Sequence, residues 1–168
     1  MDKIKILFVC LGNICRSPLA KGIFINEVNQ YNLEHLFEVD AAGTSAYHVG
    51  CLPDSRAVKV AAKYGIGLTQ LARQLADKDF EYYDYILVMD HRNYEDVTSL
   101  IKNKTKLKRI FLLRSFDCLA NNNFNVPDPF YGLDADFEEV FAICQRSLQG
   151  FIGFLANQGL IKLPVNLA

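Results

Sequence analysis

The stretch that most constrains the fold of this 168-residue chain lies near its start, where an apolar segment runs directly into a compact loop. Residues 4–9 are almost all branched or aromatic, and this run is too short for a stable helix but long enough for a buried strand. Ser17 and Pro18 then predict a helix start, because Ser caps free backbone N–H groups and Pro is tolerated at the first helical position. Residues 10–16, Cys-Leu-Gly-Asn-Ile-Cys-Arg, must therefore turn tightly from a strand into a helix.

This loop has the composition of an anion-binding site. Unpaired backbone N–H groups and the positive end of a helix dipole converge where a strand turns into a helix, and Gly12 and Asn13 tolerate the positive torsions that such a turn needs. Cys10 would lie under these N–H groups, which favour a thiolate nucleophile. Arg16 offers a planar fork for two phosphate oxygens, and Ser17 can hydrogen-bond the sulfur. We expect a phosphate-binding loop with a cysteine nucleophile.

Apolar runs alternate with amphipathic stripes along the rest of the chain. Short apolar or alternating segments predict strands at residues 4–9, 37–41, 85–89 and 109–113. Periodic stripes predict helices at residues 18–30, 54–64, 92–101 and 137–155, and a short helical turn within residues 69–80. This order predicts one α/β domain over residues 1–168, with an open parallel sheet of four strands and helices on both faces. Ligands bind beyond the carboxyl ends of such strands, so the loops that contain Cys10, Tyr47, Asp90 and Asp128 should meet.

A candidate general acid lies in residues 126–132, Val-Pro-Asp-Pro-Phe-Tyr-Gly. A departing phenolate needs a proton, and a proline on each side of Asp128 restricts the backbone that carries this carboxyl group. The alternative is an ordinary Pro-Asp turn with a solvated carboxylate. Aromatic and apolar side chains near both loops would suit a phenyl ring. The candidates for this rim are Leu11, Tyr47, His48, Phe130 and Tyr131, with core packing as the alternative for Tyr47 and a polar surface contact expected for His48.

Residues 9–18, Val-Cys-Leu-Gly-Asn-Ile-Cys-Arg-Ser-Pro, resemble the signature loop of the low-molecular-weight protein tyrosine phosphatases, and residues 128–132 are similar to the acid loop of that family. The resemblance implies a flavodoxin-like, Rossmann-like sheet of strand order 2-1-3-4. It also implies hydrolysis of phosphotyrosine, and of small aryl phosphates, through a cysteinyl-phosphate without a metal or other cofactor. Asp128 would act as acid and then as base. The loop residues assigned to phosphate binding are Leu11, Gly12, Asn13, Ile14, Cys15 and Ser17, beside the catalytic Cys10 and Arg16.

Some positions resemble supporting parts of the family, and two depart from it. Arg56, Arg73 and Asp90 lie in segments similar to family segments, and we expect them to support the site. Phe130 stands where many members have Tyr, which leaves the acid unchanged. Gln70 replaces a His of many eukaryotic members, so a histidine contact to the loop is not expected.

Composition limits the partners. A formal net charge of −1 and a pI near 6.3 give no reason to expect nucleic acid or an anionic membrane. No apolar run approaches the roughly 20 residues of a membrane span. Five cysteines without a Cys-x-x-Cys pair favour a reducing compartment and no metal site. We therefore expect a cytoplasmic monomer that acts on tyrosine-phosphorylated proteins and is inhibited by phosphate or other oxyanions.

Cys15 lies in the same loop as Cys10, so oxidation of Cys10 could be trapped as a disulfide. This predicts reversible inactivation by peroxide, and the alternative is that Cys15 only packs against the helix.

Three other functions use a loop of this kind. Arsenate reductases need closely spaced cysteines to relay a disulfide, whereas Cys51, Cys118 and Cys144 are far apart in the sequence. Phosphoarginine hydrolysis goes with Thr in related enzymes where this loop has Ile14. A catalytically silent phosphate-binding module would lack a nucleophile or an acid, and both candidates are present here.

Overall fold

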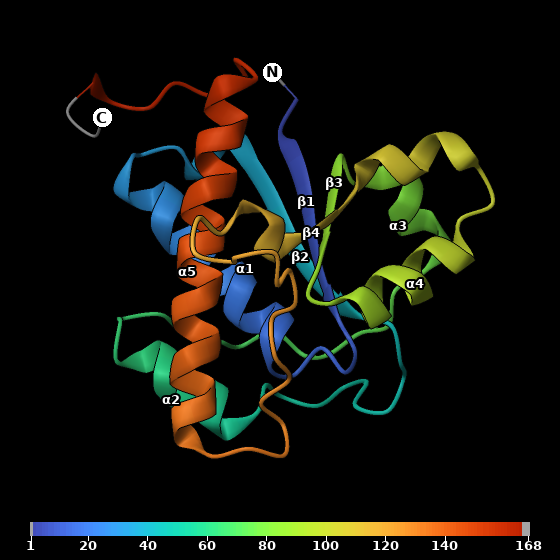
Figure 1. The fold of residues 1–168 in the computed structure, drawn as a ribbon, viewed down its shortest axis with the longest axis vertical. Helices are drawn as coiled ribbons and strands as arrows, with labels where there is room; N and C mark the ends of the chain where they lie inside the picture. Colours follow the sequence, from blue (N-terminus) through green and yellow to red (C-terminus); the bar gives the residue numbers. More distant parts are fainter. Residues whose placement is uncertain (1, 166–168) are drawn as a thin grey trace.

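The computed structural model describes residues 2–165, which form an α/β domain around a parallel sheet (Figure 1). The strands are β1 Ile4–Cys10, β2 Phe37–Gly43, β3 Tyr85–Val88 and β4 Ile110–Leu112, in the order β2-β1-β3-β4. The helices are α1 Arg16–Gln30, α2 Ser55–Ala62, α3 Asp77–Tyr82, α4 His91–Leu100 and α5 Asp134–Asn157, with short 3₁₀ turns at Glu34–Leu36, Lys104–Arg109 and Leu113–Phe116. The predicted fold class and strand order are confirmed.

Alternate side chains of β1 build two cores, one on each face of the sheet. Ile6 and Phe8 point to a core shared with α1, α2 and α5. Leu7 and Val9 point to a second core shared with α3 and α4. Figure 1 shows the same division, with α1, α2 and α5 on one side of the strands and α3 and α4 on the other. None of the helices in residues 2–165 is long and apolar enough to cross a membrane.

Several element boundaries differ from the prediction. Helix α1 begins at Arg16, so Ser17 is inside the helix and does not cap it as expected. Helix α5 extends further at both ends than residues 137–155 and continues through Gly150. A Cβ at Gly150 would lie 2.0 Å from the carbonyl oxygen of Phe116, so glycine allows the 3₁₀ turn to pack closely against α5.

Candidate active site

The loops that follow β1 and β2 meet the long loop between β4 and α5 and enclose with it a cavity of about 350 Å³. Every lining residue except Ser45 is among the site residues predicted from the sequence. Those contributed by the first loop are Cys10, Leu11, Gly12, Ile14, Cys15 and Arg16, and those from the second and the acid loop are Tyr47, His48, Asp128, Phe130 and Tyr131. Asn13 and Ser17 are buried and contact Cys10.

Two hydrogen-bond donors surround the Cys10 sulfur. The backbone N–H of Asn13 donates to Sγ at 3.2 Å, and the Ser17 hydroxyl lies 3.0 Å from it. Asn13 Nδ2 donates to Ser17 Oγ at 2.8 Å, so the hydroxyl proton has two acceptors within reach, the sulfur and the Ala42 carbonyl at 3.5 Å. Cys10 is only 3% exposed at the end of β1. These contacts place hydrogen-bonding groups around the sulfur that the sequence predicts as the nucleophile.

The backbone of the loop departs in one respect from the prediction. Asn13 has the expected positive φ of 58°, whereas Gly12 is not among the positive-φ glycines of the described chain. Gly12 is instead a point of close approach, because a Cβ there would lie 2.9 Å from His48 Cδ2. Gly43 at the end of β2 was missed, and a Cβ there would lie 2.8 Å from the carbonyl oxygen of Leu11. The tight loop therefore depends on glycine for space at two positions.

Arg16 is buried to 2% exposure and is fixed by two neighbours. Its Nη1 donates to Asp90 Oδ2 at 2.6 Å and to the Val126 carbonyl at 2.9 Å. Burial alone would lower the pKa of Arg16, but the charges of Cys10 and Asp90 and the hydrogen bond to Asp90 raise it, so the guanidinium remains charged. Asp90 also accepts a hydrogen bond from the N–H of Asn93, which caps α4. The expected supporting role of Asp90 therefore takes the form of orienting Arg16.

Asp128 lies at the mouth of the cavity, with its side chain 43% exposed. Its Oδ1 accepts the N–H of Phe130 at 3.1 Å, and its Oδ2 lies 3.5 Å from Arg16 Nη2. Upstream, Val126 N donates to the Met89 carbonyl at 2.7 Å. The carboxyl group thus lies beside the guanidinium, and Asp128 lines the same cavity as Cys10.

The rim is aromatic. Tyr47 and Tyr131 are 85% and 96% exposed, so core packing does not account for Tyr47. The Phe130 ring packs edge-on against Tyr131 at 4.8 Å between centroids and lies 5.9 Å from the ring of His48. The contact recorded for His48 is therefore aromatic, where a polar contact was expected. These rings form walls suited to a flat apolar group.

A family model described as "Low molecular weight phosphotyrosine protein phosphatase" matches residues 5–160. The chain belongs to this family. A human low molecular weight phosphotyrosine protein phosphatase is 40% identical over 148 residues, which cover 88% of this chain and 92% of that protein. The structure of a protein tyrosine phosphatase from Entamoeba histolytica, with Hepes in the active site, has a TM-score of 0.87 at 33% identity and covers 95% and 100% of the two chains. A Drosophila arginine phosphatase has a TM-score of 0.84 at 28% identity, with 90% and 97% covered.

The low molecular weight phosphatases use a cysteine-based mechanism without a metal, so the enzyme class predicted from residues 9–18 is confirmed. Within residues 2–165 of this phosphatase, no group of three or more His, Cys, Asp or Glu side chains could hold a metal ion.

Two further residues support the loop of this phosphatase from the side of β2. The backbone N–H of Arg73 donates to Asn13 Oδ1 at 3.0 Å, while its guanidinium binds Asp40 and Asp79. Gln70 donates to the Ala41 carbonyl and accepts from Lys21, and so joins β2 to α1. Except for the contact with Asp79, these hydrogen bonds join residues at least 29 positions apart. Sequence spacing could therefore not predict them.

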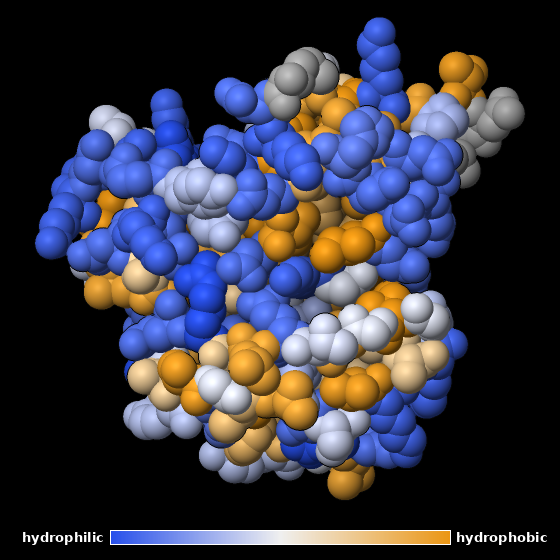
Figure 2. All heavy atoms as spheres, turned by 180° about the vertical axis from the view of Figure 1, so that it is seen from behind, coloured by the Kyte–Doolittle hydropathy of each residue, from blue (hydrophilic) through white to orange (hydrophobic). Residues whose placement is uncertain are grey.

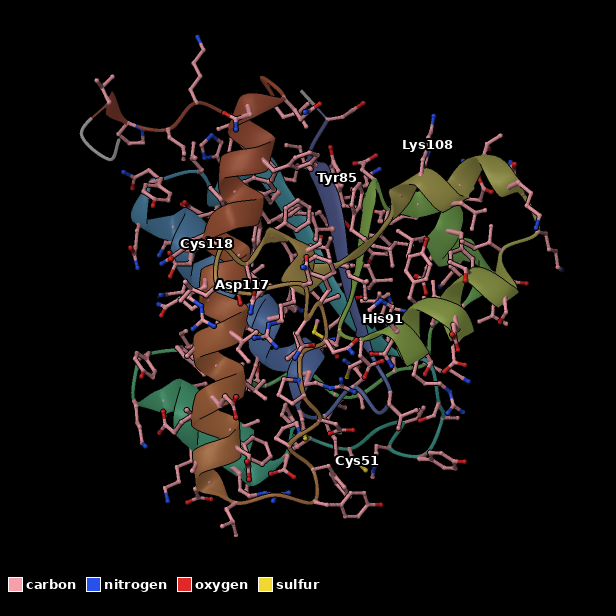
Figure 3. All side chains as sticks on the ribbon, in the orientation of Figure 1. Cys51, Tyr85, His91, Lys108, Asp117 and Cys118 are labelled. Carbon is pink, nitrogen blue, oxygen red and sulfur yellow. The ribbon has the colours of Figure 1, made fainter. Side chains whose placement is uncertain are left out.

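The cysteines of this phosphatase lie in different environments. Cys15 is buried, and burial followed by the charge of Asp54 raises its pKa, which keeps it a neutral thiol. Cys51 and Cys118 are exposed and lie far apart, with Cys51 near the site loops and Cys118 beside the middle of α5 (Figure 3). Cys144 is buried within α5. This placement does not form the outward disulfide relay that arsenate reduction requires.

Apolar side chains are also exposed outside the cavity. Figure 2 shows several of them across the lower half of the face opposite to that of Figure 1. Val49, Leu52 and Leu71 are all more than half exposed, and the segments that carry them are joined by hydrogen bonds between Gly50 N and Ala72 O and between Ala72 N and Cys51 O. The site is therefore bordered by apolar surface on the side of the second loop.

Proposed function

We propose that this phosphatase hydrolyses phosphotyrosine in proteins through a phosphocysteine at Cys10. Arg16 and the N–H groups of the loop bind the phosphate, and the Cys10 thiolate attacks phosphorus, so that an S–P bond forms as the P–O bond to the phenol breaks. Asp128 donates its proton to the departing phenolate. Asp128 then accepts a proton from the attacking water, the S–P bond breaks, and inorganic phosphate leaves.

The observation that carries this proposal is the meeting of Cys10, Arg16 and Asp128 on one cavity. The sulfur accepts the N–H of Asn13, the guanidinium is buried and charged, and Asp128 Oδ2 lies 3.5 Å from Arg16 Nη2. The shared cavity supports the assignment of Cys10 as nucleophile, Arg16 as phosphate ligand and Asp128 as acid for displacement at an aryl phosphate.

The lining favours an aromatic ester. Ile14 and Leu11 are apolar, and Tyr47, Phe130 and Tyr131 add aromatic walls. A phenyl ring would bury apolar surface between them. We expect phosphate and similar oxyanions to inhibit by occupying the loop.

The deciding experiment measures phosphate release from a phosphotyrosine peptide and from a phosphoarginine peptide of otherwise identical sequence, with EDTA present. Wild type should act on phosphotyrosine, and Cys10→Ser should release no phosphate while inorganic phosphate still raises its Tm. Cys118→Ser makes the same substitution at an exposed thiol outside the cavity and should behave as wild type. Release only from phosphoarginine, as the name of the Drosophila relative would suggest, overturns the substrate assignment, and residual turnover by Cys10→Ser overturns the mechanism.

We also propose that the enzyme works as a monomer in the cytoplasm. All five cysteines are free thiols, and the mechanism requires Cys10 in the reduced form. Size-exclusion chromatography with light scattering tests the monomer, and a dimer at micromolar concentration would overturn it.

A further inference from the structure

Arg56 joins the two loops of the site. It lies in the first turn of α2, and Figure 1 shows this helix beside the N-terminal end of α5, to which the acid loop leads. Arg56 Nη2 donates to the Phe130 carbonyl at 2.8 Å, and Nη1 donates to the Gly132 carbonyl at 2.9 Å. The guanidinium thus holds two main-chain groups on either side of Tyr131, directly after Asp128.

The other side of Arg56 is held by Asp54. Nε and Nη2 of Arg56 donate to the two carboxylate oxygens of Asp54 at 3.0 and 2.9 Å, and the guanidinium lies 4.5 Å over the ring of Phe137. The backbone N–H of Asp54 in turn donates to the Ile14 carbonyl at 2.8 Å. The contacts therefore run without a break from the catalytic loop through Asp54 and Arg56 to the acid loop.

Asp128 needs such support, because its own side-chain contacts are weak. Among residues 2–165, one carboxylate oxygen accepts only the nearby N–H of Phe130, and the other lies 3.5 Å from Arg16 Nη2. Upstream, the loop is fixed where Val126 contacts Met89 and Arg16. Arg56 supplies the corresponding anchor downstream.

We infer that Arg56 is a positioning residue which holds the acid loop at a fixed distance from the catalytic loop, so that Asp128 meets the leaving oxygen. The inference rests on the proposed role of Asp128 as the acid. Nε, Nη1 and Nη2 of the planar guanidinium reach one carboxylate and two carbonyls together, a spread of donors that the compact ammonium of Lys does not have. Loss of Arg56 should therefore weaken proton donation more than phosphate binding.

The test compares kcat/KM for two substrates with different need of an acid. Phosphotyrosine releases a weakly acidic phenol, whereas p-nitrophenyl phosphate releases a much more acidic one that leaves without full protonation. In Arg56→Met, kcat/KM should fall by a factor about tenfold larger for phosphotyrosine than for p-nitrophenyl phosphate. This difference is part of the 10²- to 10⁴-fold rate increase that a general acid contributes. Lys59→Met is the matched control, since Lys59 lies in the same helix and pairs with Asp134 at 3.1 Å without touching the acid loop carbonyls. Lys59→Met should change kcat/KM by the same factor for both substrates.

The double variant Arg56→Met with Asp128→Ala makes the test specific. If Arg56 acts through Asp128, the double variant should show the same preference between substrates as Asp128→Ala alone. If Arg56→Met lowers kcat/KM by equal factors for both substrates, while Asp128→Ala lowers it by unequal factors, the inference is overturned and the acid role stands. If Asp128→Ala does not discriminate, the acid role is overturned and the inference fails with it.

Folding is checked by the Tm and by protection with inorganic phosphate. Should Arg56→Met not fold, Arg56→Lys gives the same test, because it keeps a cation near Phe137 but cannot hold both carbonyls. A larger fall in kcat/KM for phosphotyrosine than for p-nitrophenyl phosphate in Arg56→Lys supports the inference. An equal fall for both substrates overturns it.

Discussion

The catalytic loop and the acid loop of this phosphatase are held in opposite ways. In the catalytic loop, Cys10, Asn13, Arg16 and Ser17 are all buried, and hydrogen bonds fix their side chains. In the acid loop the functional side chain, Asp128, is exposed, and the anchoring contacts are made largely through main-chain groups. One loop fixes its side chains, and the other fixes its backbone.

The difference follows from what each loop must do. The phosphate carries most of the charge in the reaction, so the groups that bind it gain from being preorganised in a site without water. The acid must meet a leaving group that enters and departs with each turnover, so it has to stay open to solvent. Changes in the catalytic loop should therefore lower activity on every aryl phosphate alike, whereas changes in the acid loop should depend on the leaving group.

The largest effect is expected for Arg16→Lys. The variant keeps a charge but loses the planar fork, so it cannot bind two phosphate oxygens and Asp90 together. We expect kcat/KM to fall about 10²- to 10³-fold, by equal factors for phosphotyrosine and p-nitrophenyl phosphate. Arg92→Lys, an exposed arginine in the first turn of α4, is the control and should match wild type. If kcat/KM falls by unequal factors for the two substrates, the proposed difference between the catalytic loop and the acid loop is wrong.

Asp128→Asn is expected to have the next largest effect, and an unequal one. The amide is close in size but has no proton to give, so phosphotyrosine hydrolysis should fall by about 10²-fold or more. The loss on p-nitrophenyl phosphate should be several-fold smaller. The measurement is kcat/KM for both substrates at one pH. Asp134→Asn, at an exposed position in the first turn of α5, is the control, and equal losses for Asp128→Asn would contradict the acid role.

The same contrast explains how far the sequence could predict the site. The catalytic loop is contiguous, so the strand before Cys10, the positive φ of Asn13 and the proximity of Ser17 to the sulfur followed from neighbouring residues. The start of α1 at Arg16 did not follow from neighbouring residues. The Ser17 hydroxyl contacts the Cys10 sulfur, and α1 has no side-chain cap.

The long-range support of the two loops, from Asp90 to the catalytic loop and from Arg56 to the acid loop, could not be derived in this way. Asp90 and Arg56 lie 74 and 76 residues from the Arg16 side chain and the Gly132 carbonyl that they bind, and nothing in local spacing pairs them. Their supporting role was expected only from resemblance, and the contacts that define it required the folded chain.

Ser17→Ala tests the catalytic loop more gently. It removes the hydroxyl group that lies 3.0 Å from the sulfur and accepts from Asn13, while the main-chain donor of Asn13 remains. One hydrogen bond to a charged group corresponds to about a tenfold fall in kcat/KM, equal for both substrates. Alkylation of Cys10 by iodoacetate should slow in parallel, because the same sulfur is the nucleophile in both reactions. Unchanged alkylation would show that Ser17 does not activate the sulfur. Ser45→Ala, which alters a cavity hydroxyl bonded to the Leu11 carbonyl and not to the sulfur, is the comparison.

The smallest effect, several-fold in recovered activity, concerns Cys15, which shares the buried loop. Peroxide converts the Cys10 thiolate into a sulfenic acid, and attack by Cys15 would form a disulfide and release water. Dithiothreitol should then restore most of the activity of wild type but little of that of Cys15→Ser, each measured against its own untreated sample.

The pH dependence follows from the burial of Cys15. Burial raises its pKa, so Cys15 gains thiolate character only as the pH rises, and the attack on the sulfenic acid should become more efficient toward alkaline pH. The recovered fraction of wild type should therefore increase with pH, while that of Cys15→Ser stays low. Cys118→Ser, which removes an exposed thiol remote from the loop, should recover like wild type. Equal recovery by Cys15→Ser would mean that Cys15 only packs in the loop, and that burial protects Cys10 without the help of a second sulfur.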